Sequence, residues 1–297
     1  MRPAATVLLL REENGELEVL MMRRGAGLAF MAGMWVFPGG RVDEADASAG
    51  IRARVIRGAA GGWRNRLCAP EGVPLAEDVA LAHYVAACRE TFEESGVLLA
   101  RDRRGEPCDA GRTARLQPER EAIAADAASF LDLLEREDLD LDVAPLVYWS
   151  HWITPSLEPK RFDTRFFAIA VPPGQEASAD RSELTEHAWV QPARLQEALE
   201  RGEIRVVPPT LLTLEDLAES HARHGSLVAM LEAERERPTP PVMPRIDVRT
   251  DAFHVVMPWD AGYGEIPGEG CPTGEGFPEH LLRRRSRLAV ARDRGTR

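Results

Sequence analysis

Three glutamates lie close together in the stretch Ala87–Leu99, whose sequence is ACRETFEESGVLL. In a helix, Glu90, Glu93 and Glu94 stand at i, i+3 and i+4 and share one face within an arc of about 100°. Like charges at this spacing destabilise a helix by about 0.2–0.5 kcal/mol per pair, so water, a neighbouring base or a metal must offset the repulsion. Magnesium binds through a few carboxylates, waters and substrate phosphates. The spacing therefore fits a metal site, with a solvated acidic face as the alternative.

A helix from about Leu75 to Ser95 is expected to carry these carboxylates. Gly96 suits the left-handed position that follows the last turn of a helix. The apolar residues Val97–Leu99 are expected to begin the next strand. Arg89 comes directly before the acidic run, where a surface ion pair is the alternative to a role in the site.

A β-hairpin is predicted at the start of the chain. Val7–Arg11 and Leu17–Arg23 are apolar segments joined by Glu13-Asn14-Gly15, and Asn-Gly favours a tight hairpin turn. A short strand is predicted at Trp35–Phe37, just before Pro38-Gly39-Gly40. The remaining expected elements are two or three short helices within 47–88, a loop at 101–115, a helix at 118–137, strands at 147–153, 165–171 and 188–190, and helices at 192–201 and 209–224.

Length and composition indicate an ordinary soluble globular protein. The chain has 297 residues, 44% of them hydrophobic and 29% charged, which fits one large domain or a domain with an appendage. We expect a body at 1–236 with a helical insertion at about 47–85. A Pro/Gly-rich extension at 237–297 is expected to pack on this body. For Pro258–Asp260 two roles stay open, packing the extension onto the body or forming a contact in a homodimer.

Net charge, hydropathy and cysteine spacing argue against nucleic-acid binding and a membrane span, and they indicate a reducing compartment. The net charge of −11 argues against non-specific binding to nucleic acid. The apolar run Ala4–Leu10 is too short for a membrane span and reads as a buried strand. The four cysteines form no Cys-x-x-Cys pair, so a reduced cytoplasmic protein is expected.

The acidic stretch and the upstream glycines together resemble the Nudix hydrolase signature, Gly-x5-Glu-x7-Arg-Glu-(apolar)-x-Glu-Glu-x-Gly-(apolar). Gly40 fits the first glycine, and Arg89–Val97 matches the second half. The sequence departs from the signature in three places. Asp46 replaces the first Glu, Thr91 replaces an apolar residue, and residues 47–88 replace the x7 segment.

The long insertion resembles the coenzyme A diphosphatase-like members of this family. The segments FMAGMWVFPGG (30–40) and PKRFDTRFF (159–167) carry the same resemblance. The upstream Arg/Ser-rich coenzyme A motif is met by Arg23 and Arg24 but not by Gly25 and Ala29. The resemblance covers about residues 4–220.

The resemblance implies an α/β fold, the Nudix α/β/α sandwich with a mixed sheet. It implies hydrolysis of a diphosphate with Mg²⁺ or Mn²⁺ bound by Glu90, Glu93 and Glu94, helped by a main-chain carbonyl near Gly39 or Gly40. Glu93, Glu94 and Arg89 are then the catalytic group, with Arg89 orienting the carboxylates. The preferred substrate is coenzyme A or an acyl-CoA. The alternatives are another nucleoside diphosphate derivative, such as ADP-ribose, NADH or a dinucleotide, and a non-catalytic binding module.

Further candidates come from charged residues outside the signature. Because a later-loop glutamate activates water in some Nudix enzymes, Glu183 and Glu186 are candidate bases, with a solvated loop as the alternative. The substrate phosphates need cations, for which Arg offers a planar fork. The candidate phosphate-binding residues, each with a solvated or structural alternative, are Arg23, Arg24, Lys160, Arg161 and Arg165.

Overall fold

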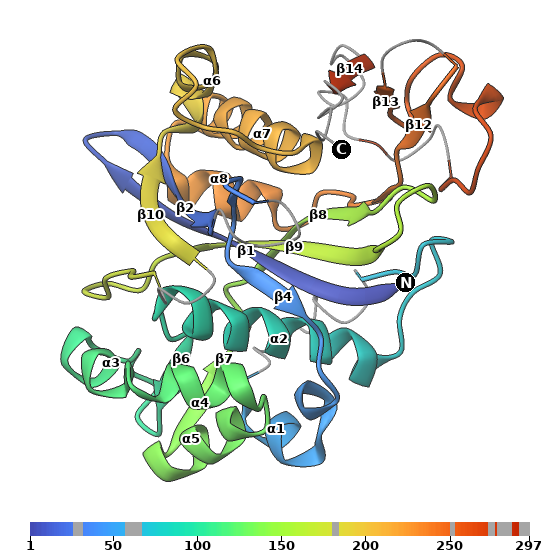
Figure 1. Ribbon diagram of the computed structural model, residues 1–297. Coiled ribbons are helices and arrows are strands. Elements are labelled where there is room, and N and C mark those ends of the chain that lie inside the picture. The colour runs from blue at the N-terminus through green and yellow to red at the C-terminus, as the bar shows by residue number, and fades with distance from the viewer. Residues whose placement is uncertain are drawn as a thin grey trace.

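A mixed eight-stranded sheet forms the centre of the computed structural model, which describes residues 1–25, 32–56, 67–179, 184–249, 253–272, 277 and 287–290 (Figure 1). Its strands are β1 (Arg2–Glu13), β2 (Glu16–Arg24), β3 (Trp35–Val36), β4 (Gly39–Arg41), β8 (Val147–Ile153), β9 (Phe162–Ala170), β10 (Leu184–Val190) and β11 (Pro241–Val242). The strand order is β10-β2-β1-β9-β8-β11, with β3 paired to β2 and β4 paired to β1. The pairs β1–β9 and β8–β11 are parallel and the others antiparallel.

The hairpin predicted at the start of the chain is confirmed as β1 and β2. Asn14 and Gly15 both have left-handed backbones, with φ of 54° and 79°. Two such residues in a row make a turn whose twist matches that of the flanking strands. The Asn-Gly turn and the apolar pattern of the two strands therefore favour the same pairing of β1 with β2.

Helices cover both faces of the large sheet. Val7 and Leu9 of β1 belong to the apolar cluster that contains α2 (Glu77–Ser95). Leu8 and Leu10 belong to the cluster of the opposite face, with α7 (Pro208–His224) and α8 (Leu227–Glu234). Burial on both faces explains the unbroken apolar run of β1. The expected α/β class with a mixed sheet is confirmed.

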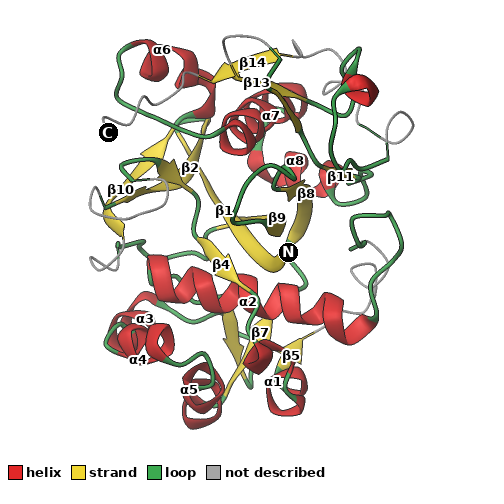
Figure 2. Cartoon of the chain, turned by 45° about the vertical axis from the view of Figure 1, so that its right-hand side comes forward, coloured by secondary structure: helices red, strands yellow, loops and turns green. Residues whose placement is uncertain are grey.

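A further layer lies on the side of α2 that faces away from the large sheet (Figure 2). It consists of α1 (Ala49–Ala53), α3 (Ala110–Leu116), α4 (Glu119–Ala125), α5 (Ser129–Glu137) and a small sheet of β5 (Val55–Ile56), β6 (Ala100–Asp102) and β7 (Leu139–Asp142). Every residue from Ala80 to Phe92 is buried as a result. The helix that carries the acidic run thus lies between two layers, which fixes its position.

The structure corrects several expected elements between 97 and 142. The strand after α2 begins at Ala100 and not at Val97. The expected loop at 101–115 contains the helix α3. Asp109 caps the first turn of α3, because its carboxylate accepts a hydrogen bond from the Arg112 amide at 2.7 Å. The single helix expected at 118–137 is two helices. They are separated at Asp126, whose backbone is extended and whose carboxylate accepts from the Ala128 amide at 3.0 Å.

The described part of the insertion holds a short helix before α2. α1 is the helix between 47 and 76 among the described residues, and Cys68 and Pro74 form an isolated β-bridge. α1 packs against α5, where a Cβ at Gly50 would lie 2.6 Å from Leu131 Cδ2. Residues 57–66 lie outside the described residues, so a cap formed by the insertion stays a prediction.

The described part of the C-terminal segment contacts the body through side chains and one strand. β11 extends the large sheet at β8, and Arg161 Nη1 donates to Glu269 Oε2 at 2.7 Å. Trp259 and Phe277, whose ring centroids lie 5.3 Å apart, pack with the apolar cluster of β8 and α7 in the body, which favours the packing role for Pro258–Asp260. Further strands are β12 (Arg245–Asp247), β13 (Phe253–Val256) and β14 (Arg287–Val290). The boundary at 236 and the homodimer stay predictions.

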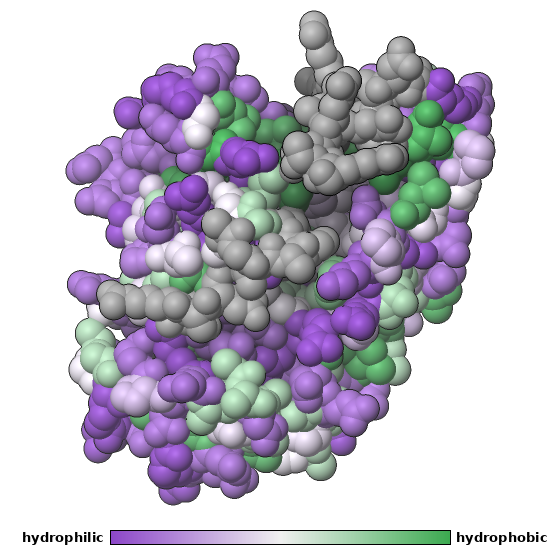
Figure 3. All heavy atoms as spheres, in the orientation of Figure 1, coloured by the Kyte–Doolittle hydropathy of each residue, from purple (hydrophilic) through white to green (hydrophobic). Residues whose placement is uncertain are grey.

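Polar residues dominate the face shown in Figure 3, with small apolar areas between them. None of the helices in the described ranges has the length and apolar character needed to cross a membrane. All four cysteines have free thiols. Two features named in the sequence, Phe30-Met31 and Glu183, lie outside the described part of the chain.

Candidate active site

The two halves of the split signature meet where α2 crosses β4. Gly40 pairs with Ala5 of β1, and a Cβ at Gly40 would lie 2.4 Å from Glu90 Oε1. Gly39 has φ of 155°, and its Cβ would lie 2.4 Å from Ala5 O. Both positions therefore need glycine, one for the carboxylate of α2 and one for the neighbouring strand.

Arg89 is the centre of the acidic cluster. Its side chain is 4% exposed and makes two parallel bonds to Asp46, from Nε to Oδ1 at 2.9 Å and from Nη2 to Oδ2 at 3.0 Å. Nη1 donates to Glu90 Oε1 at 3.0 Å and to Glu93 Oε2 at 3.1 Å. Nη2 also donates to the main-chain oxygen of Arg41 at 2.9 Å. One guanidinium thus orients three carboxylates and holds β4.

Glu94 is held by the other half of the signature. Its Oε2 accepts from the Gly39 amide at 2.7 Å. Gly96 ends α2 in the left-handed conformation, with φ of 72°, as predicted. Thr91, at the usual apolar position, is fully buried. Neither the insertion nor the departures at Asp46 and Thr91 prevent the signature residues from assembling.

Burial and like charge shape the titration of this cluster. Burial raises the pKa of Glu90 to about 7, Arg89 opposes the rise, and Glu93 adds to it. Burial acts to lower the pKa of Arg89, but the hydrogen bonds and charges of Asp46, Glu90 and Glu93 raise it well above its usual value. Arg89 is therefore a permanent cation, and Glu90 sits near the balance between its two protonation states at neutral pH.

The donor set at this place suits a hard cation. Glu90, Glu93 and Glu94 lie on adjacent turns of one helix beside the backbone of β4, and Glu90 fits against Gly40 only because no Cβ is there. Within the described ranges, no three His, Cys, Asp or Glu side chains are grouped as a metal centre. The carboxylates are turned toward Arg89 and the Gly39 amide instead. The chemistry of a metal site fits, and a closed ligand cluster does not form in this arrangement.

Glu186 and Arg23, predicted as base and phosphate ligand, are brought to each other and lie on the surface. They are register partners on β10 and β2, and Arg23 Nη1 lies 3.2 Å from Glu186 Oε2 with both side chains about half exposed. Arg24 follows on β2, where it is partly buried and its amide donates to Met34 O at 3.0 Å. Among the described residues, the hydrogen bonds and ion pair of Glu186 are made to Arg23 and not to the cluster around Arg89.

Arg161 and Arg165 both make contacts within the protein, which favours the structural alternative, and their role as phosphate ligands stays a prediction. Arg161 donates to Thr154 O at 3.1 Å and to Glu269, so it joins the β8–β9 connection to the C-terminal segment. Arg165 is 1% exposed. Lys160 is exposed. The alternation along β9 places Arg165 on the same face as Phe167 and Ile169, toward α2, which the charged motif alone did not reveal.

Arg165 belongs to a buried polar cluster that sequence reasoning did not identify. It lies 2.9 Å from Asp163 Oδ2, and it donates to His83 Nε2 at 3.0 Å and to Cys68 O at 2.6 Å. Asp163 Oδ1 in turn lies 2.5 Å from His151 Nε2. These residues come from the insertion, α2, β8 and β9, so only the fold brings them together.

Burial disfavours the charged form of both histidines in this cluster. Burial lowers the pKa of His83 to about 4, and the charge of Arg165 adds to the shift. Burial also lowers the pKa of His151, which its bond to Asp163 opposes. The sheet register aligns Gly40, Ala5, Arg165 and His151 across four strands. Because neighbouring strands lie about 4.8 Å apart, Arg165 is about 10 Å from the glycine beside Glu90.

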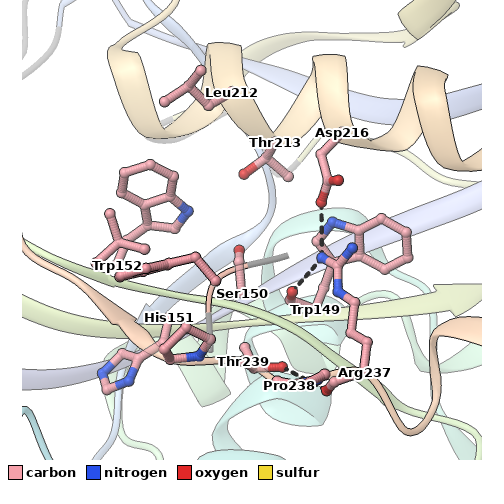
Figure 4. A pocket seen from close by; sticks show the side chains of 13 residues that line it. Trp149, Ser150, His151, Trp152, Leu212, Thr213, Asp216, Arg237, Pro238 and Thr239 are labelled. Atoms are coloured by element: carbon pink, nitrogen blue, oxygen red, sulfur yellow. Dashed lines mark hydrogen bonds and ion pairs between the residues drawn. The ribbon is translucent and has the colours of Figure 1, made fainter. Parts of the chain in front are cut away.

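A cavity with a mainly apolar lining and a few polar groups lies on the other side of the sheet, between β8 and α7 (Figure 4). Arg237 packs over the Trp149 ring at 4.2 Å and donates to Asp216 at 2.8 Å. Trp149 Nε1, Trp152 Nε1 and Thr213 Oγ1 are buried and have no hydrogen-bond partner among the described residues. Ordered water ordinarily satisfies groups of this kind. The cavity is separate from the acidic cluster.

A mixed sheet with an acid-bearing helix packed on the Gly-Gly strand is the arrangement of the Nudix hydrolases. The family described as the NUDT19 Nudix domain matches residues 2–217, and the chain belongs to it. A solved Nudix hydrolase from Alicyclobacillus acidocaldarius is 26% identical, with a TM-score of 0.61, and the match covers 78% of this chain and 96% of that one.

Relatives of known name share the same region. The chain is 31% identical to the acyl-coenzyme A diphosphatase NUDT19 of Gallus gallus, over 90% of this chain and 80% of that protein. It is 32% identical to the Homo sapiens protein of the same name, over 67% of this chain and 60% of that protein. A putative nudix hydrolase 7 of Caenorhabditis elegans is 27% identical over 73% of this chain and 61% of that protein. The chain thus spans about 60% of the length of two of these three relatives.

Proposed function

We propose that the protein is a metal-dependent diphosphohydrolase that cleaves coenzyme A or acyl-CoA to a phosphopantetheine derivative and adenosine 3′,5′-bisphosphate. The observation that carries the proposal is the junction at which Arg89 orients Asp46, Glu90 and Glu93 beside the two glycines of β4. The names of the chicken and human relatives support the substrate class.

Mg²⁺ or Mn²⁺ is the proposed cofactor, held by Glu90, Glu93 and Glu94 with a main-chain carbonyl near Gly39 or Gly40. When bound, such a cation neutralises a diphosphate and lowers the pKa of a water that attacks phosphorus. The protein's part is to keep the carboxylates oriented, and Arg89 does so through charge-assisted hydrogen bonds.

The remaining candidate residues are proposed for different roles. Arg23 and Arg24 at the end of β2 are the proposed phosphate contacts, since neither is fully buried. Glu186 stays the proposed base, although Arg23 engages it. For Arg161 and Arg165, the internal contacts above support a structural role. We further propose a cytoplasmic protein, in line with four free thiols.

The test is a product-resolved screen of the full chain with Mg²⁺. Coenzyme A, acetyl-CoA and longer acyl-CoAs are incubated beside ADP-ribose, NADH and diadenosine polyphosphates, and products are identified by mass spectrometry. Release of adenosine 3′,5′-bisphosphate from the CoA compounds is the expected result. Cleavage of the other nucleotides alone would reject coenzyme A and acyl-CoA as substrates and retain the proposed diphosphate hydrolysis. No cleavage, with metal still bound, would point to a binding module.

A further inference from the structure

The last turn of α2, which carries Glu93 and Glu94, ends without free carbonyls. The last four carbonyls of a helix have no partner inside it. Here Phe92 O accepts from the Gly96 amide at 2.9 Å and Ser95 O from the Ser178 amide at 2.8 Å. The two carbonyls between them belong to the two acidic residues, and both are bound by one side chain from another helix.

That side chain is Arg120 of α4. Its Nε donates to Glu93 O at 2.8 Å and its Nη2 to Glu94 O at 2.7 Å. Arg120 is 9% exposed, so these bonds form in a largely dry environment. A cation at this end of a helix is also favoured by the helix dipole. The planar guanidinium spans two adjacent carbonyls, which the single ammonium of a lysine does not do.

The same guanidinium is itself fixed from two sides. Nη1 donates to Gln117 Oε1 and to Ser178 Oγ, both at 3.0 Å, and Nη2 donates to Ser178 O at 3.0 Å. Gln117 also donates to Gly96 O at 2.9 Å, just past the helix end. Ser178 lies in the segment that leads toward β10. Arg120 therefore joins the acidic turn, the layer beneath α2 and the approach to β10.

We propose that Arg120 is a positioning residue that fixes the last turn of α2 so that Glu93 and Glu94 can bind a divalent cation. It acts on the backbone of that turn and not on substrate. The inference rests on the proposed function for the identity of the metal site. Outer partners of metal ligands typically change metal affinity by about 10–100-fold when removed.

The test measures Mn²⁺ binding to the full chain without nucleotide, by the electron paramagnetic resonance signal of free Mn²⁺. In Arg120→Gln, the Kd for Mn²⁺ is expected to rise at least about tenfold. The matched control is Arg115→Gln, because Arg115 is a neighbouring cation of α3 that bonds Glu137 on the surface. Its Kd is expected to stay within about twofold of the wild type, a change well below that of a lost outer partner.

Circular dichroism and thermal unfolding accompany each measurement. A folded Arg120→Gln variant with a Kd within about twofold of the wild type overturns the inference, because a purely structural residue changes stability and not metal affinity. If Arg120→Gln does not fold, Arg120→Lys decides, since it keeps the charge and loses the fork. A raised Kd supports the proposal and an unchanged Kd overturns it.

Kinetics separate this inference from the proposed function. With acyl-CoA as substrate, the metal concentration for half activation should rise in Arg120→Gln while the KM at saturating metal stays near that of the wild type. A wild type that cleaves nothing, beside a variant with weakened Mn²⁺ binding, would reject the function and keep the role of Arg120. An active wild type, beside a variant with unchanged Mn²⁺ binding, would keep the proposed function and reject the role of Arg120. A wild type that binds no Mn²⁺ overturns both.

Discussion

At the scale of single residues, the pair of Arg89 and Asp46 does the most to assemble the site. The family's signature has a glutamate where Asp46 stands, yet the shorter side chain still makes two parallel bonds. Its Oδ2 also accepts from the Asp43 amide at 2.8 Å, which holds the carboxylate in line with the guanidinium. The substitution is therefore compatible with the orienting role of Arg89.

Asp46→Asn is expected to destabilise the protein by about 3 kcal/mol, the low end for breaking a buried ion pair, because Arg89 loses its bidentate partner while Glu90 and Glu93 still compensate part of its charge. Asp46 is 2% exposed and Arg89 4%. Guanidinium chloride unfolding measures the change. Glu13→Gln is the control, since Glu13 pairs with Arg11 at 59% exposure and such pairs contribute about 0–1 kcal/mol. An equal effect of both variants would contradict the assignment.

Glu94→Gln is expected to lower kcat by at least about a hundredfold, the scale for losing a group that stabilises charge in the transition state. The amide keeps the size of the side chain and can still accept from Gly39, so unfolding should change little. Mass spectrometric product formation at saturating Mg²⁺ is the measurement. Glu232→Gln, an exposed change of the same kind on α8, should keep wild-type turnover. Near-normal turnover of Glu94→Gln would reject the metal assignment.

At the scale of elements, the site depends on how closely β4 approaches α2. The strand can lie against the carboxylate of Glu90 because Gly40 has no side chain. Glu90 cannot move freely, since it is buried and bonded to Arg89. A methyl group at position 40 must therefore displace either the carboxylate or the strand.

Gly40→Ala is expected to reduce kcat/KM by about tenfold or more, as misplaced site groups of this kind commonly do. The loss of stability should be smaller than for Asp46→Asn, because the change displaces a carboxylate without removing a buried charge. Steady-state kinetics with unfolding curves measures both. Gly264→Ala is the control, because nothing lies within 4 Å of a Cβ there and its backbone is ordinary. Unchanged kcat/KM in Gly40→Ala would show that β4 does not shape the site.

How far the elements could be predicted depends on whether their signals are local. The hairpin, α2 and Gly96 follow from turn chemistry and spacing along the chain. The break between α4 and α5 does not, because Asp126 interrupts a segment whose Ala and Leu spacing continues through it. Arg120 could not be found from sequence either. Its partners at Glu93, Glu94 and Ser178 are distant in the chain, and a lone arginine on an amphipathic helix reads as solvated.

At the scale of the whole molecule, a buried row of polar groups joins parts that are far apart in sequence. His83 of α2 accepts from Arg165 of β9, which also bonds Cys68 in the insertion and Asp163 beside His151. His83 can accept at Nε2 because its Nδ1 donates to Val79 O at 2.9 Å. Arg165 thus links the insertion, the acidic helix and the sheet, and its bond to His83 requires that the imidazole stay neutral.

That requirement makes the whole fold sensitive to acid. The folded pKa of His83 is lowered to about 4 from an ordinary 6.5, so its contribution to stability is fully present above pH 6.5. Between pH 6.5 and 4 the unfolded chain binds a proton that the folded chain does not, and stability falls as the pH falls. From pH 7 to pH 5 the loss due to this group is about 2 kcal/mol, at about 1.4 kcal/mol per unit below pH 6.5.

His83→Gln is the variant that isolates this loss, because glutamine does not titrate and its oxygen can still accept from Arg165. The free energy of unfolding is measured with guanidinium chloride at pH 7 and pH 5 for the wild type and the variant. The wild type should lose about 2 kcal/mol more than the variant over this range. His187→Gln, on the exposed part of β10, should fall in parallel with the wild type. Parallel curves for His83→Gln as well would mean that the acid sensitivity lies with other groups, such as His151, and that His83 is not the proton-sensitive member of the row.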